Sequence, residues 1–192
     1  MKKIKLLTVA IFAFLSFAYN ANAKENKYAI EPNHTSVLWT ANHFGFSNVS
    51  GKFTDIEGAI VFDEKEPKKS SVDVTIKISG LNSGIAKLDE HLKSKDFFDA
   101  ANFLTAKFVS KKIIVTGKNK AKIEGELTLL NITKPVVLNA VFNKVGVNPL
   151  NQKETIGFSA EAEINRSDFG IKYAVPNVSD KVKLVIEVEA NR

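Results

Sequence analysis

Residues 72–79 read Val-Asp-Val-Thr-Ile-Lys-Ile-Ser, so aliphatic side chains alternate with polar ones along this stretch. Successive side chains of an extended chain point to opposite faces, and a period of two therefore predicts a strand with one dry and one wet face. The same alternation occurs at 122–129, 156–164 and 182–189. One-sided strands of this kind are typical of antiparallel sheets.

Shorter stretches of the same character predict further strands. They are residues 28–30, 36–41, 49–53, 58–62, 106–111, 113–116 and 136–145. Polar clusters with Gly, Pro or Asn at 64–68, 117–120 and 148–151 predict hairpin connections between them. One helix is expected between Ser83, as its N-cap, and Ser94, because Ile85, Leu88 and Leu92 form one apolar stripe. Many short alternating strands predict an all-β sandwich or barrel.

The N-terminal segment has the three parts of a secretory signal peptide. Lys2, Lys3 and Lys5 precede an apolar run over 6–17, and Ala21-Asn22-Ala23 follows it. The run of about 12 residues is shorter than the roughly 20 that a membrane-spanning helix needs, which disfavours a retained anchor. We expect cleavage after Ala23, a periplasmic location and a mature single domain of residues 24–192 that does not span a membrane.

Composition excludes several classes of function. The net charge of +6 falls to +3 when the three leader lysines are removed, and the remaining charges are scattered, which argues against nucleic-acid binding. The chain has no cysteine, so it has no disulfide, thiol nucleophile or thiolate metal site. It also lacks glycine-rich nucleotide-binding motifs, and we expect no cofactor. A homodimer is left open.

The mature chain is rich in phenylalanine, and this suggests an apolar ligand. Aromatic rings often serve only to fill a core. A barrel of about eight strands, however, is just wide enough to hold one small ligand. Small residues expected to face inward would leave room for it; they are Ala41, Gly125, Ala140, Ala160 and Ala162.

The histidines do not form a recognisable metal motif. His34, His43 and His91 lack the close spacing that would direct two rings at one ion. We therefore predict no metal site and no enzymatic activity, and favour a binding protein.

A series of short motifs runs through nearly the whole mature chain: His34-Thr35-Ser36, Asn42 to Ser47, Asp89 to Ser94, Asp96-Phe97-Phe98-Asp99 and Arg166 to Gly170. In their order and spacing these motifs resemble the YceI-like family of periplasmic polyisoprenoid-binding proteins. The resemblance implies an extended, antiparallel, lipocalin-like barrel of about eight strands with one or two short helices. It also implies non-enzymatic carriage or sequestration of a long isoprenoid lipid, such as a quinone or its precursor. The rival hypothesis is a periplasmic stress or interaction protein with a packed barrel and no bound lipid.

The candidate ligand-binding residues fall into two groups. Apolar residues on inward faces or beside the distinctive motifs are predicted to line a tunnel; these are Trp39, Phe53, Leu92, Phe98, Phe108, Leu127, Phe142, Phe158 and Phe169. Four polar residues, His43, His91, Arg166 and Asp168, are predicted to lie near a tunnel end. They would either contact the head group or brace the segments that close the barrel.

Overall fold

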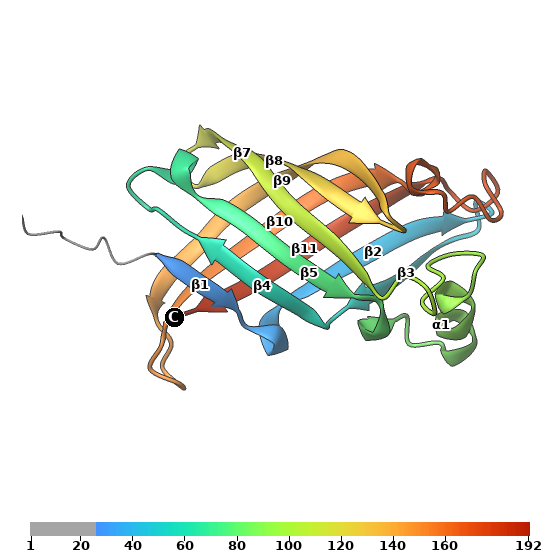
Figure 1. The fold of residues 1–192 in the computed structure, drawn as a ribbon, viewed down its shortest axis with the longest axis horizontal. Coiled ribbons are helices and arrows are strands. Elements are labelled where there is room, and N and C mark those ends of the chain that lie inside the picture. Colours follow the sequence, from blue (N-terminus) through green and yellow to red (C-terminus); the bar gives the residue numbers. More distant parts are fainter. Residues whose placement is uncertain (1–25) are drawn as a thin grey trace, which may run out of the picture.

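The computed structural model describes residues 26–192, and the expected signal peptide at 1–23 lies outside the described residues. The described chain forms one antiparallel sheet that closes on itself, because β1 pairs with both β4 and β11 (Figure 1). The strands are β1 (Lys27–Ile30), β2 (Ser36–His43), β3 (Ser47–Phe53), β4 (Ile56–Val61), β5 (Ser71–Lys77), β6 (Leu81–Asn82), β7 (Thr105–Gly117), β8 (Lys120–Leu129), β9 (Ile132–Val147), β10 (Glu154–Asn165) and β11 (Lys181–Asn191).

We call each of the eight strand positions around the barrel a stave. Eleven strand segments make an eight-stranded barrel because three of these staves are each interrupted and consist of two successive segments. β1 and β2 pair with the same edge of β11 and are separated by the 3-10 turn η1 (Pro32–His34). β3 and β4 form the second stave, and β5 and β6, separated by η3 (Ile78–Gly80), form the third. The predicted closed antiparallel barrel is confirmed.

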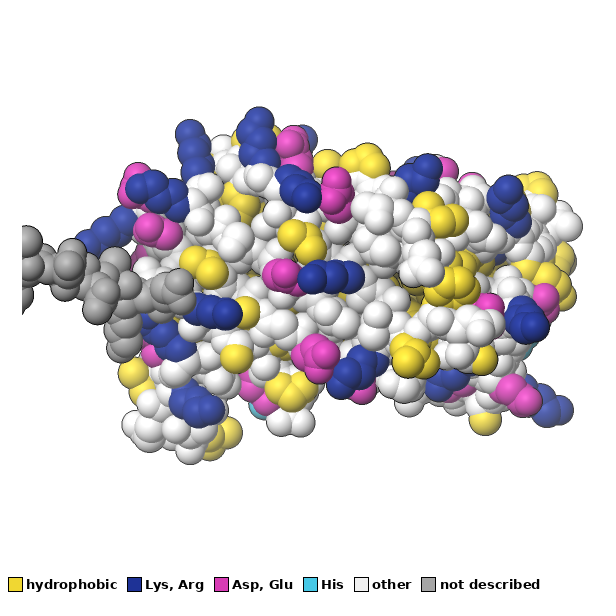
Figure 2. Space-filling view, viewed as in Figure 1, with side chains coloured by type: hydrophobic (Ala, Val, Ile, Leu, Met, Phe, Trp, Pro, Cys, Tyr) yellow, Lys and Arg dark blue, Asp and Glu magenta, His cyan; other side chains and the backbone are white. Residues whose placement is uncertain are grey.

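Alternation along each strand separates the inside of the barrel from its surface. On β10 and β11, Ala160 faces Ile186 across the ladder and both point inward, whereas neighbouring Glu161 is exposed. Figure 2 shows Lys, Arg, Asp and Glu side chains interspersed over the outer face. Ion pairs join neighbouring strands there, for example Lys183 with Glu161 and Lys107 with Asp73.

Two local predictions differ from the structure. Segments 106–111 and 113–116 belong to the single strand β7, which continues through a bulge between Ser110 and Lys112. The helix α1 (Ala86–Lys93) begins after Ser83, with Ile85 at its N-cap position. Gly84 has a left-handed φ of 78°, which is incompatible with an α-helix, while Ser83 instead donates to the Asp89 carboxylate from its backbone N–H and hydroxyl.

The two ends of the barrel differ. We call one the closed end: it carries α1, the segment 94–104, and the chain from η4 (Arg166–Phe169) to Asp180 (Figure 1). The other is the open end, where the β4–β5, β7–β8 and β9–β10 connections lie beside the start of β1 and the end of β11. No helix within residues 26–192 is long and apolar enough to cross a bilayer.

Candidate functional site

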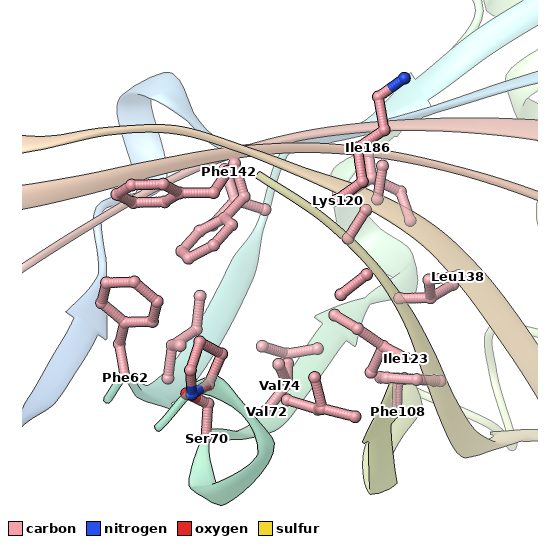
Figure 3. Close-up of a pocket in the computed structure, with 18 of the residues that line it drawn as sticks. Phe62, Ser70, Val72, Val74, Phe108, Lys120, Ile123, Leu138, Phe142 and Ile186 are labelled. Atoms are coloured by element: carbon pink, nitrogen blue, oxygen red, sulfur yellow. The ribbon is translucent and has the colours of Figure 1, made fainter. Parts of the chain in front are cut away.

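A cavity of about 500 Å³ lies inside the barrel. Aliphatic and phenyl side chains from all eight staves line it, and Figure 3 shows Phe62, Val72, Val74, Ile123 and Leu138 converging on it. This volume lies within the roughly 300–1,000 Å³ typical of small-molecule sites. The wall can make apolar contacts with a ligand but offers it few hydrogen bonds.

Three alanines that are paired across adjacent strands contribute to this space. Ala121 pairs with Ala140 across β8 and β9, and Ala140 pairs with Ala160 across β9 and β10. All three line the cavity. At these paired positions three adjacent strands therefore present only methyl groups to the interior.

An aromatic cluster borders the cavity toward the open end. The rings of Phe62, Phe142 and Phe158 have centroids 5.1–5.4 Å apart. They pack on a small core of buried residues that includes Tyr28 and Ile156. These rings contribute a large flat apolar surface on which a chain or a planar group can lie.

Phe108 and Val136 are buried residues that line the cavity. Both also belong to the buried core cluster of the closed end. A Cβ added at Gly125 would lie 2.4 Å from Cζ of Phe108, so the ring occupies the place of a missing side chain on β8.

The mouth of the cavity lies between two turns of the open end. Glu64, Pro67 and Ser70 of the β4–β5 connection stand on one side, and residues 117–120 of the β7–β8 hairpin on the other. The 3-10 turn η2 (Pro67–Lys69) belongs to the first of these turns. Lys118, Lys120 and Glu64 give this rim its charges, and in Figure 3 the Lys120 ammonium points away from the apolar side chains. An apolar wall beneath a polar rim suits an amphipathic molecule whose tail enters first.

Comparison with known proteins gives the family. The model of the YceI-like domain matches residues 28–190, which is nearly all of the described chain.

The chain belongs to the YceI-like family.

Curated relatives and solved structures agree with this membership. The chain is 38% identical to a UPF0312 protein of Pseudomonas fluorescens over 98% of this chain and 97% of that protein. It is similar to the crystal structure of the Campylobacter jejuni YCEI protein, with 37% identity, a TM-score of 0.69, and coverage of 79% of this chain and 89% of that one. A polyisoprenoid binding domain from Saccharophagus degradans shares the fold, with a TM-score of 0.66, 10% identity, and coverage of 85% of this chain and 97% of that domain.

The nine apolar candidates are divided between the two ends of this YceI-like barrel. Phe108, Leu127, Phe142 and Phe158 line the cavity. The other five pack in the closed end instead, in or against its buried cluster; these are Trp39, Phe53, Leu92, Phe98 and Phe169. Phe53 and Phe98, for instance, meet edge to face at 5.5 Å. The closing segments place these rings: Leu92 lies on α1, Phe98 directly after it, and Phe169 in η4.

Arg166 lies in the closed end and braces it. Its side chain is buried, and Nε, Nη1 and Nη2 donate to the carbonyl oxygens of Ser179 at 2.9 Å, Ile171 at 3.2 Å and Val178 at 2.9 Å. Burial lowers the pKa of Arg166, and nearby Asp180 opposes this shift. The guanidinium thus holds the chain between η4 and β11 in one conformation.

The other polar candidates also lie at the closed end, away from the cavity wall. His43 is exposed at the end of β2, with its ring 4.5 Å from that of Phe44. His91 on α1 has Nε2 3.0 Å from the Asp96 carboxylate and meets the Phe97 ring edge to face at 5.1 Å. Asp168 is exposed on the outer surface of η4. The structure therefore does not bring His43, His91, Arg166 and Asp168 together around one ligand position.

One group of possible metal ligands occurs in the described region, and it lies outside the cavity. Glu31, His34 and Glu189 place one ligand atom each within 4.8 Å of one another. Glu31 already has other partners, because its carboxylate accepts from the backbone N–H groups of Asn33 and His34 and caps η1. Burial raises the pKa of Glu31, but the hydrogen bond with Nδ1 of the His34 ring and the bonds from the two backbone N–H groups outweigh this and lower the pKa below its usual range.

Most of the aliphatic lining is absent from the residues predicted from the sequence to bind a ligand. Val72, Val74, Ile123, Leu138 and Ile186 occupy inward positions of strands that alternation identifies correctly. The same alternation could have identified these five residues as inward-facing candidates for the cavity lining. It could not separate cavity wall from packed core, because that depends on the register between strands.

Proposed function

We propose that this chain binds the apolar tail of an isoprenoid lipid, such as a polyisoprenoid or a quinone or quinone precursor, inside its barrel without performing chemistry on it. The observation that carries this proposal is the apolar cavity of about 500 Å³ with one polar mouth. Membership of the YceI-like family and the shared fold of a polyisoprenoid binding domain support the class of lipid.

The energetics of such a site favour a long hydrocarbon over a small polar ligand. Each CH₂ group removed from water contributes about 0.8 kcal/mol, so an apolar wall can hold a chain without specific hydrogen bonds. The polar rim at Glu64, Lys118 and Lys120 would keep a head group hydrated at the mouth. We expect the cavity to discriminate lipids by shape and length more than by fine chemistry.

We also propose that the protein acts in the periplasm after removal of residues 1–23. The charged start, the short apolar run and Ala21-Asn22-Ala23 support export. Protein recovered from a periplasmic fraction should begin at Lys24 when its N-terminus is sequenced. A retained Met1 in a membrane fraction would show that the leader is an anchor.

Extraction of the purified protein with organic solvent, followed by mass spectrometry, tests lipid binding. The wild-type protein should release an isoprenoid lipid in a defined ratio to protein. Ala160→Phe, which places a ring in the cavity, should release little, whereas Ala29→Phe, at an exposed site on β1, should behave as the wild type. Empty extracts from both wild type and Ala29→Phe would favour the rival, an interaction protein that acts through its surface.

A further inference from the structure

The β9–β10 hairpin projects from the open end and carries an apolar tip (Figure 1). β8 begins at Lys120, which pairs with Val141, whereas β9 continues past this point to Val147 and pairs there with β10. The connection between β9 and β10 therefore extends beyond the β8 ladder. At its tip Leu150 is 91% exposed and Val147 is 62% exposed.

The turn that carries Leu150 pairs most of its own backbone N–H groups. Oδ1 of Asn148 accepts from the Leu150 N–H at 2.9 Å, and Oδ1 of Asn151 accepts from the Lys153 N–H at 3.0 Å. The backbone N–H groups of Asn148 and Gln152 donate to the carbonyl oxygens of Lys153 and Asn148. Unpaired backbone groups are costly to move out of water. This turn can therefore enter a less polar phase at a low cost.

Exposed lysines occur beside this tip and at the cavity mouth. They are Lys118, Lys120, Lys144 and Lys153. The two hairpin segments that carry them, residues 111–123 and 139–153, contain no Asp or Glu. The β4–β5 connection on the same rim is neutral, because residues 63–69 contain three acidic residues and three lysines. The open end thus combines an apolar tip with an excess of positive charge.

The closed end also exposes apolar side chains, but it lacks this concentration of lysines. Phe46, between β2 and β3, is 91% exposed, as Leu150 is. Residues 42–50 around Phe46 contain no lysine or arginine. Residues 86–104, which include α1, contain three lysines and four acidic residues. The two ends therefore differ in charge and not in the exposure of their apolar tips.

We propose that the open end docks on the anionic surface of a phospholipid bilayer through Leu150 and the lysines of the two hairpins. The leucine enters the interface and the ammonium groups contact lipid phosphates. Docking brings the mouth between residues 64–70 and 117–120 to the membrane, so that an apolar tail passes between bilayer and cavity without crossing water. This inference rests on the proposed function and adds the partner with which the barrel exchanges its lipid.

Flotation of the mature chain with phosphatidylcholine vesicles, with and without phosphatidylglycerol, tests the docking. The wild type should bind the anionic vesicles at least about tenfold more tightly than the neutral ones, and added salt should weaken this binding. Leu150→Ser should weaken it about tenfold, because an exposed leucine no longer leaves water. The double variant Lys118→Gln/Lys153→Gln should weaken it by about 25-fold on anionic vesicles alone, at about fivefold for each lysine.

The closed end supplies the matched control variants. Phe46→Ser removes an equally exposed apolar side chain, and Lys87→Gln/Lys95→Gln removes two exposed lysines. Both should bind anionic vesicles within twofold of the wild type. A loss in Phe46→Ser equal to that in Leu150→Ser would show unspecific apolar adsorption and overturn docking through the open end.

A fluorescent probe at each tip identifies the docked end directly. The chain has no cysteine, so a polarity-sensitive fluorophore can be attached at one introduced by Leu150→Cys or Phe46→Cys. Anionic vesicles should shift the emission of the probe at residue 150 toward that of an apolar environment and leave the probe at residue 46 unchanged. No vesicle binding by the wild type, or a larger shift at residue 46, would overturn the docking proposal.

Binding of an isoprenoid alcohol in solution separates this proposal from the proposed function. Leu150→Ser should bind the alcohol with the affinity of the wild type, because Leu150 does not line the cavity. A wild type that binds the alcohol but no vesicles would refute docking alone. A wild type that binds vesicles but no isoprenoid would refute the proposed function.

Discussion

Aromatic rings fill the space beside two glycines of the closed-end half of the barrel, whereas the space beside three alanines nearer the open end is left as cavity. A Cβ at Gly51 would lie 2.6 Å from Cζ2 of Trp39, and one at Gly125 would meet Phe108. Ala121, Ala140 and Ala160 also leave room, but they stand side by side on three adjacent strands and border the cavity. Small residues thus give a cavity only where their register places them together.

The comparison also separates two uses of phenylalanine. Phe169 is 1% exposed in the closed end and contacts core on all sides. Phe142 and Phe158 are only partly buried, because one side of each ring faces the cavity. Phe169 therefore contributes mainly to stability. Phe142 and Phe158 each have one face that a ligand in the cavity can contact.

Removing one phenylalanine ring from each end is the strongest test of this difference in packing. We expect Phe169→Ala to lower the free energy of unfolding by about 3–5 kcal/mol, the range for a fully packed ring. Phe142→Ala should cost about half as much or less, because fewer neighbours surround that ring. Chemical denaturation followed by circular dichroism gives both values, and equal losses would mean that the open end is packed as tightly as the closed end.

Arg166 tests whether the closed end is structural. Arg166→Ala should lower the free energy of unfolding by about 2–3 kcal/mol, since it leaves buried carbonyl oxygens without donors. Arg166→Lys should recover only part of this loss, because an ammonium cannot reach three carbonyls in the same geometry. Lipid affinity of the folded variants should stay within twofold of the wild type. A tenfold loss of affinity with unchanged stability would place Arg166 at the head group instead.

Alkaline pH should weaken the open end through Tyr28. Burial and the hydrogen bond that its hydroxyl donates to Glu154 raise the pKa of Tyr28 from 10.0 to about 12. The unfolded chain therefore loses this proton first, and stability that is complete below pH 10 should fall by about 1–2 kcal/mol as the pH rises to 12. Tyr28→Phe should lack this component when denaturation curves at the two pH values are compared. If the wild type and Tyr28→Phe lose the same stability between the two pH values, the raised pKa of Tyr28 is not the cause of the loss.

The histidines should have the smallest effects. His43→Ala should change stability by less than about 0.5 kcal/mol, because the side chain is exposed. His91→Ala should cost about 1 kcal/mol through loss of its hydrogen bond with Asp96 and its contact with Phe97. Neither should alter lipid affinity in a binding titration. A clear loss of lipid affinity in either variant would show that this histidine contributes to lipid binding.

The sequence could predict the barrel but not its interior. Alternation identifies strands because burial of one face imposes a period of two, and the turns carry the residues that their dihedrals require. The start of α1 was misplaced because the left-handed Gly84 interrupts the helix after Ser83. The cavity depends on the pairing of Ala121 with Ala140 and of Ala140 with Ala160, residues that are about 20 positions apart in sequence.

The division of the phenylalanines could not be read from the sequence for the same reason. Phe158 lies in an alternating segment and Phe169 in a distinctive motif, yet the first lines the cavity and the second lies in η4 at the closed end. Gly170, at a φ of 89°, ends η4 and turns the chain at this point. Which rings become core depends on how such closing segments fold back over the barrel.

A crystal structure of the mature chain with geranylgeraniol, an alcohol of four isoprene units, tests the central claim most directly. The account predicts electron density for the hydrocarbon inside the cavity, in contact with the ring cluster of Phe62, Phe142 and Phe158 and with Phe108, and with the hydroxyl at the mouth near Lys118. The closed end should be unchanged, with Arg166 on its three carbonyls. Density for the lipid among Phe53, Leu92 and Phe169, or a cavity filled by rearranged side chains with the alcohol excluded, would contradict the account.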